Sequence, residues 1–219
     1  NLRFLDGQIQ RIYQHLQDRG ILDDTILVVV GDHGEAFGQH PHNYAHSRMS
    51  FNENVRTPAL FVNRALFPAR TIDTPTSHVD ILPTLLDALK LPYNAERMQG
   101  ESLFQDSLRR KYVFLYGNED TLSSVSREQV KLQVSLRDGT CWVYDVRHDP
   151  EEKNRLPCTG FSAQREALLA YRRHQRGELL AVACDLDVAL ARTRDRAGVG
   201  LPLAAVGQAG VDRRAQRQR

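Results

Sequence analysis

The spacing of apolar residues changes along the chain and divides it into helices and strands. Between residues 2 and 16 the apolar positions lie three or four apart, which predicts an amphipathic helix. A continuous apolar run over 25–30 predicts a strand buried on both faces, of the kind found in parallel sheets. The runs 58–62 and 80–91 predict a second strand and a second amphipathic helix. Helices and buried strands in alternation indicate an α/β fold.

The pattern becomes one of short strands after residue 110. Three β-rich runs occupy 112–116, 129–136 and 141–146, and Asp138-Gly139 between the last two is a hairpin signal. We therefore expect a small antiparallel sheet attached to the α/β layer. Helical spacing returns from Ser162.

These elements predict the domain organisation. One folded part covers 1–157, with the α/β portion over 1–110 and the small antiparallel sheet over 111–157. A helical extension is expected over 158–190, and the tail over 191–219 is expected to be basic and disordered. The chain begins inside an amphipathic helix and without Met, so we interpret it as a fragment that starts in mid-domain.

Charge is distributed unevenly along the chain. Of the 219 residues, 26% are charged and 41% hydrophobic, which is ordinary for a globular chain. Residues 1–160 carry 18 Lys and Arg against 21 Asp and Glu, whereas 161–219 carry 11 Arg against 6 acids. The folded part is therefore not a nucleic-acid binder by charge. For the tail there are two interpretations, a solvated tail or contact with anionic lipid or nucleic acid. We favour a solvated tail, because no aromatic residues are interleaved among its arginines.

Cysteine usage and hydropathy add two expectations. Cys141, Cys158 and Cys184 are odd in number and show no CxxC spacing, so the sequence indicates neither a disulfide framework nor a thiolate zinc site. No apolar run approaches the roughly 18 residues of a membrane-spanning helix.

Candidate chemistry lies at the carboxyl end of the 25–30 strand, where open α/β sheets bind ligands. Asp32 and His33 follow that strand directly and can both ligate a divalent cation. The alternative is that Asp32 caps a helix while His33 packs or is solvated. Three further histidines, His40, His42 and His46, lie in an aperiodic loop and favour the functional interpretation.

Several neighbouring residues remain open to two interpretations. Glu35 either orients the ring of His33 or is a solvated loop acid. His78 either approaches the site or has a capping or surface role, which we favour. Glu53 and Arg56 are expected to form a structural pair behind the histidine loop.

Four blocks of this sequence resemble, in order, the sulfatase branch of the alkaline phosphatase superfamily. Thr25 to Phe61, which reads TILVVVGDHGEAFGQHPHNYAHSRMSFNENVRTPALF, is similar to the family's second metal-binding block. The remaining blocks are His78-Val79-Asp80-Ile81-Leu82-Pro83-Thr84-Leu85-Leu86, Gln99-Gly100-Glu101-Ser102-Leu103, and Trp142-Val143-Tyr144-Asp145 with Asp149-Pro150-Glu151-Glu152 and Asn154. The resemblance covers about 150 residues and implies the C-terminal portion of an alkaline-phosphatase-like α/β sandwich with a small C-terminal antiparallel sheet.

The resemblance also implies roles for individual residues. Asp32 and His33 match ligands of the active-site metal, a divalent cation such as Ca, Mn or Zn. His46 matches the position from which membrane phosphoethanolamine and phosphoglycerol transferases contact the phosphoryl group, and His40 lies near the same rim. A cation on sulfuryl or phosphoryl oxygens would neutralise developing charge, and His46 and His40 would be the catalytic contacts.

Two departures from the family pattern are visible in the sequence. Sulfatases commonly carry a sulfate-binding Lys near the position of Ser47, but residues 1–89 contain no Lys, and Arg48 is not equivalent to an ammonium. The Cys or Ser of the formylglycine motif and the Thr of the transferases belong to the family's N-terminal half. None of the three cysteines here has the Cys/Ser-x-Pro-x-Arg context.

The sequence therefore predicts a fragment of a metal-dependent, sulfatase-like enzyme that hydrolyses or transfers sulfate or phosphate ester groups. A conventional calcium-dependent arylsulfatase and a catalytically inactive module are the alternatives. The expected partner is an ester substrate and not a nucleic acid, and the isolated fragment is expected to be inactive. By resemblance alone, the parent protein is expected in the cell envelope, anchored in the inner membrane and facing the periplasm. The oligomeric state is left open.

Overall fold

The computed structural model describes residues 2–46, 49–105, 107–116 and 121–177. Contacts divide the chain into two units, Asn1–Arg172 and Arg173–Arg219. In the second unit the described residues are 173–177, and they are helical. The predicted basic tail over 191–219, like residues 178–190 of the predicted helical extension, lies outside the described residues. In the part of the chain that is described, no helix is long and apolar enough to span a membrane.

Helix α1 (Leu2–Asp18) confirms the first predicted helix. It ends where Gly20 adopts a φ of +67°, a left-handed conformation that glycine tolerates without strain. The helix contains no buried residue, and its apolar positions, among them Leu2, Phe4 and Leu5, are exposed. Within the described residues, the apolar stripe of α1 therefore has no core to cover.

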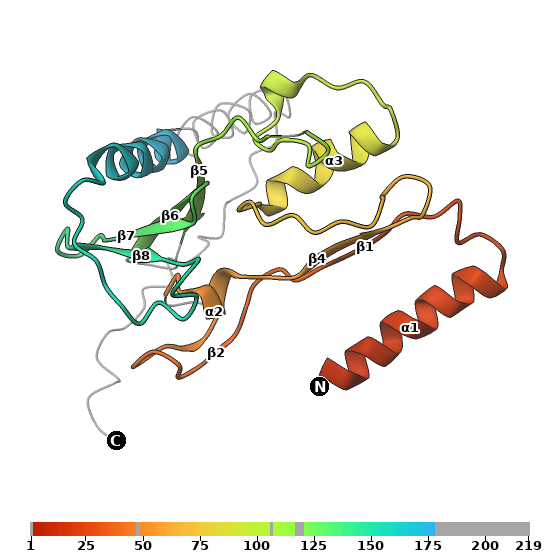
Figure 1. The fold of residues 1–219 in the computed structure, drawn as a ribbon, viewed down its shortest axis with the longest axis horizontal. Coiled ribbons are helices and arrows are strands. Elements are labelled where there is room, and N and C mark those ends of the chain that lie inside the picture. The colour runs from red at the N-terminus through yellow and green to blue at the C-terminus, as the bar shows by residue number, and fades with distance from the viewer. Residues whose placement is uncertain (1, 47–48, 106, 117–120, 178–219) are drawn as a thin grey trace, which may run out of the picture. The chain divides into compact units, whose positions relative to one another are not determined.

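Strand β1 (Leu27–Val30) pairs with β4 (Ala59–Val62) in an antiparallel two-stranded sheet (Figure 1). This corrects the expectation of a parallel-type strand buried on both faces. The partner runs antiparallel, β1 has no fully buried residue, and Val30 and Leu60 are exposed. An apolar run shows that a strand exists but does not encode the direction of its partner.

The loop that follows β1 contains small regular elements that the sequence did not predict. Strands β2 (Ala36–Phe37) and β3 (Tyr44–Ala45) pair antiparallel, with Ala36 opposite Ala45. A four-residue helix, α2 (Asn52–Val55), follows them and precedes β4. The loop is therefore a hairpin and one helical turn.

The second predicted helix begins as the 3-10 turn η1 (His78–Asp80) and continues as α3 (Ile81–Ala88). A further 3-10 turn, η2 (Ala95–Arg97), follows. The Asp80 side chain is fully buried and accepts hydrogen bonds from the backbone N–H groups of Ser77 and Glu101. The Arg110 guanidinium contacts both carboxylate oxygens of Asp80, so the buried charge is paired.

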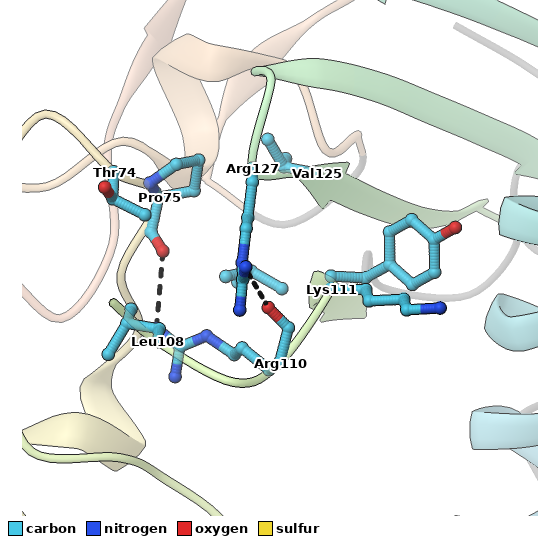
Figure 2. Close-up of a pocket in the computed structure, with 9 residues that line it drawn as sticks. Thr74, Pro75, Leu108, Arg110, Lys111, Val125 and Arg127 are labelled. Atoms are coloured by element: carbon cyan, nitrogen blue, oxygen red, sulfur yellow. Dashed lines mark hydrogen bonds between the residues drawn. The ribbon is translucent and has the colours of Figure 1, made fainter. Parts of the chain in front are cut away.

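Arg110 also connects the segments around it. Its guanidinium donates to the carbonyl oxygen of Pro75 at 3.3 Å, and its own carbonyl oxygen accepts from Nε of Arg127 at 3.0 Å (Figure 2). One arginine thus fixes the start of α3, the preceding loop and the entry to the C-terminal sheet.

The C-terminal sheet is an antiparallel meander of four strands, β5 (Tyr112–Tyr116), β6 (Thr121–Ser126), β7 (Val130–Ser135) and β8 (Cys141–Asp145). The expected small antiparallel sheet is present, with β6 as an additional strand. The hairpin predicted at Asp138-Gly139 is confirmed, with Gly139 at a φ of +71°. Leu122, Leu132 and Val143 form the core of this region together with Leu168 of the helix over 162–177.

A disulfide joins Cys141 and Cys158, whose Cα atoms lie 6.1 Å apart. The expectation that the cysteines form no disulfide is therefore wrong. The reason is an antiparallel bridge between Val143 and Leu156. In an antiparallel register, the residue two positions before Val143 lies opposite the residue two positions after Leu156. These residues are Cys141 and Cys158.

Lys131 and Glu152 form an ion pair inside the molecule. Both side chains have no exposed surface, and Nζ of Lys131 lies 2.8 Å from Oε1 of Glu152. The other carboxylate oxygen of Glu152 accepts a hydrogen bond from the backbone N–H of Asn52. Burial lowers the pKa of Lys131 and raises the pKa of Glu152, because desolvation outweighs the attraction between the two charges. The pair therefore joins β7 to α2 at a large desolvation cost.

Removing one partner of this pair should cost far more stability than removing a partner of the adjacent exposed pair. Lys131→Met leaves a buried carboxylate without its cation and should lower the free energy of unfolding by about 3–5 kcal/mol. The control is Lys153→Met, because Lys153 pairs with Glu151 on the surface, and it should change stability by less than about 1 kcal/mol. Urea unfolding of the 219-residue chain measures both. Similar losses for the two variants would contradict the buried pair.

Candidate metal centre

The candidate site begins where the chain leaves β1 and turns against α2. The backbone N–H of Gly34 donates to the carbonyl oxygen of Asn54 at 2.8 Å. A Cβ atom on Gly34 would lie 2.2 Å from the carbonyl oxygen of Glu53, far inside van der Waals contact. Only glycine permits this approach of two backbones. The close contact fixes where His33 and Glu35, on either side of Gly34, leave the chain.

Asp32 and His33 lie together, as the sequence predicts. Oδ1 of Asp32 accepts the backbone N–H of His33 at 2.9 Å, and this bond lowers the pKa of the Asp32 carboxyl. Oδ2 of Asp32 lies 3.6 Å from Nε2 of His33. Nδ1 of His33 lies 2.9 Å from the carbonyl oxygen of Gly34, which can only accept, so Nδ1 carries the proton.

This arrangement suits a divalent cation. With the proton on Nδ1, the Nε2 atom of His33 keeps its lone pair, and a backbone acceptor behind the ring is the usual support of a metal-binding histidine. Asp32 is an exposed carboxylate held in its ionised form. Asp32 and His33 thus have the chemistry of metal ligands, but two ligands alone do not complete a coordination shell.

The β2–β3 hairpin brings two further side chains to His33. Since Ala36 lies opposite Ala45, the flanking residues Glu35 and His46 emerge next to each other. Nδ1 of His46 lies 3.0 Å from Oε2 of Glu35. The His46 ring stacks on the His33 ring, with centroids 4.1 Å apart and planes inclined by 22°. Glu35 therefore contacts His46, an alternative that the sequence did not suggest.

His40 has different partners from His46. Nδ1 of His40 lies 2.6 Å from Oε1 of Glu53, and Nε2 lies 3.2 Å from the carbonyl oxygen of Glu152. The His40 ring is largely buried and stacks on the Phe51 ring, with the two ring centroids 3.7 Å apart. None of these contacts involves Asp32, His33 or Glu35. The structure does not join His40 to the cluster of His33, Glu35 and His46. The predicted catalytic role of His40 stays a prediction.

Glu53 is the centre of a partly buried polar network that sequence reasoning missed. The expected partner was Arg56, but the carboxylate binds His40 and also accepts the side-chain amide of Asn43 at 2.9 Å. The Asn43 amide also donates to the Asn54 side chain at 2.7 Å. Burial raises the pKa of Glu53, but hydrogen bonds from His40, its own backbone and Asn43 outweigh that effect and lower the pKa overall. Buried donors find acceptors wherever the fold supplies them, irrespective of sequence distance.

The other two histidines of interest lie outside the cluster. His42 is exposed and adopts a φ of +64° in the loop between β2 and β3. Nε2 of His78 lies 2.7 Å from the carbonyl oxygen of Gly31, so His78 fastens the end of β1 to the start of η1. His78 also lines a cleft of about 1130 Å³ along β4, whereas neither Asp32 nor His33 lines it.

Comparison with known proteins relates this chain to the sulfatases. Residues 1–91 match the family model described as Sulfatase. An arylsulfatase of Clostridium perfringens (strain 13 / Type A) is 26% identical over 167 residues, which cover 71% of this chain and 34% of the relative. The family model and this relative support the predicted resemblance to the sulfatase family of the alkaline phosphatase superfamily.

Two solved structures share the fold of this chain. BT4656, solved in complex with its substrate D-glucosamine-2-N,6-O-disulfate, is 22% identical, with a TM-score of 0.58 over 78% of this chain and 38% of that chain. A phosphonate monoester hydrolase from Silicibacter pomeroyi is 24% identical, with a TM-score of 0.54 over 79% of this chain and 38% of that chain. The predicted alkaline-phosphatase-like α/β fold with a small antiparallel sheet is confirmed.

The chain spans a minor part of its relatives. It covers between 13% and 34% of the length of the curated proteins that it matches. Two residues of the sulfatase-like motifs in this part, Asp80 and Glu152, have structural roles as buried carboxylates that fasten backbone N–H groups. Asp32 and His33, in contrast, are exposed and free to bind a ligand.

The close contact at Gly34 yields a prediction for stability. Gly34→Ala places a methyl group against the Glu53 carbonyl and should lower the free energy of unfolding by more than about 1 kcal/mol. Gly7→Ala is the control, because Gly7 lies in α1 with open space around it, and alanine should stabilise that helix by about 0.5–1 kcal/mol. Thermal unfolding monitored by circular dichroism measures both. If the Gly34→Ala variant were as stable as the unmodified chain, the loop that follows β1 would not pack against α2.

Proposed function

We propose that the complete protein is a metal-dependent hydrolase of sulfate esters and that this chain supplies half of its metal site. The observation that carries the proposal is the Asp32–His33 pair at the end of β1. The pair is exposed, its carboxylate is ionised, and Nε2 of His33 is available as a ligand. It lies inside the segment that matches the Sulfatase family. The arylsulfatase of Clostridium perfringens and BT4656, with its sulfated sugar substrate, support an ester of sulfate as the substrate class.

Each named side chain has a defined part in this proposal. A divalent cation bound by Asp32 and His33 would neutralise charge on the oxygens of the ester group. His46, whose ring stacks on that of His33, would donate a hydrogen bond to the same oxygens. His40, enclosed by Glu53 and Phe51, positions the loop. No residue of this chain matches the family's nucleophile motif, and the chain alone is inactive for that reason.

A phosphate or phosphonate ester is the second candidate substrate. Residues 1–89 contain no Lys that would bind sulfate as in other sulfatases, and they carry His46 next to Ser47. One structural neighbour is a phosphonate monoester hydrolase. Transfer of the group to an acceptor other than water belongs to this second candidate. Assaying the complete protein with a chromogenic sulfate ester and a phosphodiester in parallel separates the two.

The cellular location of the protein is also part of the proposal. We place it in the cell envelope, outside the cytoplasm, with the parent protein anchored at the membrane. The disulfide between Cys141 and Cys158 supports an oxidising compartment, because such bonds rarely persist in the cytosol.

Removing either proposed ligand should abolish the activity of the complete protein. Asp32→Ala and His33→Ala each delete an exposed side chain outside the core, so turnover should fall by at least about 10²-fold while the unfolding temperature changes little. The control is His42→Ala, an exposed histidine of the same loop that contacts neither residue, and its turnover should equal that of the parent. Retained turnover in Asp32→Ala and His33→Ala, with metal at saturation, would refute the site assignment.

A further inference from the structure

The cluster around His33 contains more potential ligands than the Asp32–His33 pair. One nitrogen of His33, one nitrogen of His46 and one carboxylate oxygen of Glu35 all lie within 4.8 Å of one another. Among the described residues, this is the one group of three histidine, cysteine or acidic side chains with such spacing. All three side chains are exposed, so an ion can reach them without any opening of the fold.

The ligand atoms of Glu35 and His46 are as close as neighbouring atoms of a coordination shell, and the His33 nitrogen lies within 4.8 Å of both. In a tetrahedral site with metal–ligand bonds of about 2.0–2.2 Å, neighbouring ligand atoms lie about 3.3–3.6 Å apart. Nδ1 of His46 and Oε2 of Glu35 are 3.0 Å apart and share a proton. Replacing that proton by a cation needs small rotations of exposed side chains, whereas the backbone is already fixed by the β2–β3 pairing.

The kind of donor selects the kind of metal. Two imidazole nitrogens and one carboxylate oxygen are a donor set typical of Zn²⁺ sites that keep an open position. Ca²⁺ instead requires six to eight oxygen ligands, which this cluster does not offer. The neighbouring Asp32 carboxylate, with Oδ2 at 3.6 Å from Nε2 of His33, adds negative charge but no third nitrogen.

We propose that His33, Glu35 and His46 form a three-residue site for Zn²⁺ or a similar transition-metal ion, and that this chain holds the ion by itself. The proposal rests on the proposed function in sharing His33 with it, but it adds Glu35 and His46 as ligands and excludes Ca²⁺ as the preferred ion. Because His46 binds the ion before the substrate does, the His46 ring lies beside the reacting group when the substrate enters.

The test measures metal binding directly and needs no catalytic activity. The untagged 219-residue chain is titrated with Zn²⁺ in competition with a chromogenic chelator, and the titration is repeated with Ca²⁺. Glu35→Gln and His46→Ala should each weaken Zn²⁺ binding by at least about 100-fold. The matched control is His148→Ala, because His148 pairs with Asp145 at 2.8 Å on the surface but belongs to no group of three potential ligands among the described residues. Its Zn²⁺ affinity should equal that of the parent chain.

Each outcome decides the proposal. One equivalent of Zn²⁺, lost in Glu35→Gln and His46→Ala and not displaced by Ca²⁺, supports it. Binding that is lost in Asp32→Ala but kept in Glu35→Gln and His46→Ala overturns it and leaves the Asp32–His33 pair of the proposed function intact. A chain that binds no Zn²⁺, or that prefers Ca²⁺, also overturns it, while the hydrolytic function is decided separately by turnover of the complete protein.

Discussion

The buried carboxylate of Glu152 joins the C-terminal sheet to the segment that carries the candidate metal centre. One of its oxygens pairs with Lys131 of β7, and the other accepts the backbone N–H of Asn52 at the start of α2. The backbone carbonyl oxygen of Glu152 lies 3.2 Å from Nε2 of His40, within hydrogen-bond distance. Without this contact, α2 would lose its anchor and Gly34 would lose the surface against which it packs. The location of Asp32 and His33 therefore depends on a residue more than a hundred positions away.

Burial and exposure are divided between anchoring and binding residues. Of the anchoring side chains, Glu152 is fully buried and Glu53 and His40 are largely buried, and their polar atoms are engaged inside the protein. The binding side chains, Asp32 and His33, are exposed and keep free oxygen and nitrogen atoms. Such a division is expected of a metal site, because ligands must reach an ion while their supports must not move.

The sequence predicted those features that depend on local pattern. Helix α1, the hairpin at Asp138-Gly139 and the adjacency of Asp32 and His33 each follow from residues close together in the chain. Features that depend on pairing between distant segments were missed. The apolar run of β1 does not indicate whether its partner strand is parallel or antiparallel. Strand β6, with sequence TLSSVS, buries three serines at positions where an apolar strand pattern would be expected. The Glu53–His40 contact and the Cys141–Cys158 disulfide arise from the tertiary fold and have no local signal.

The central claim is that Glu152 holds the candidate metal centre in place through α2. Hydrogen exchange of the backbone N–H of Gly34, which donates to Asn54 in α2, tests it most directly. Glu152→Gln keeps the shape of the side chain but weakens the charge-assisted bonds to Asn52 and Lys131. The account predicts that the Gly34 amide then exchanges at least about tenfold faster, because a hydrogen bond to a charged group contributes about 1.5–3 kcal/mol. The adjacent and exposed Glu151→Gln should leave the rate unchanged. Equal exchange of Gly34 in the parent and in Glu152→Gln would contradict the account.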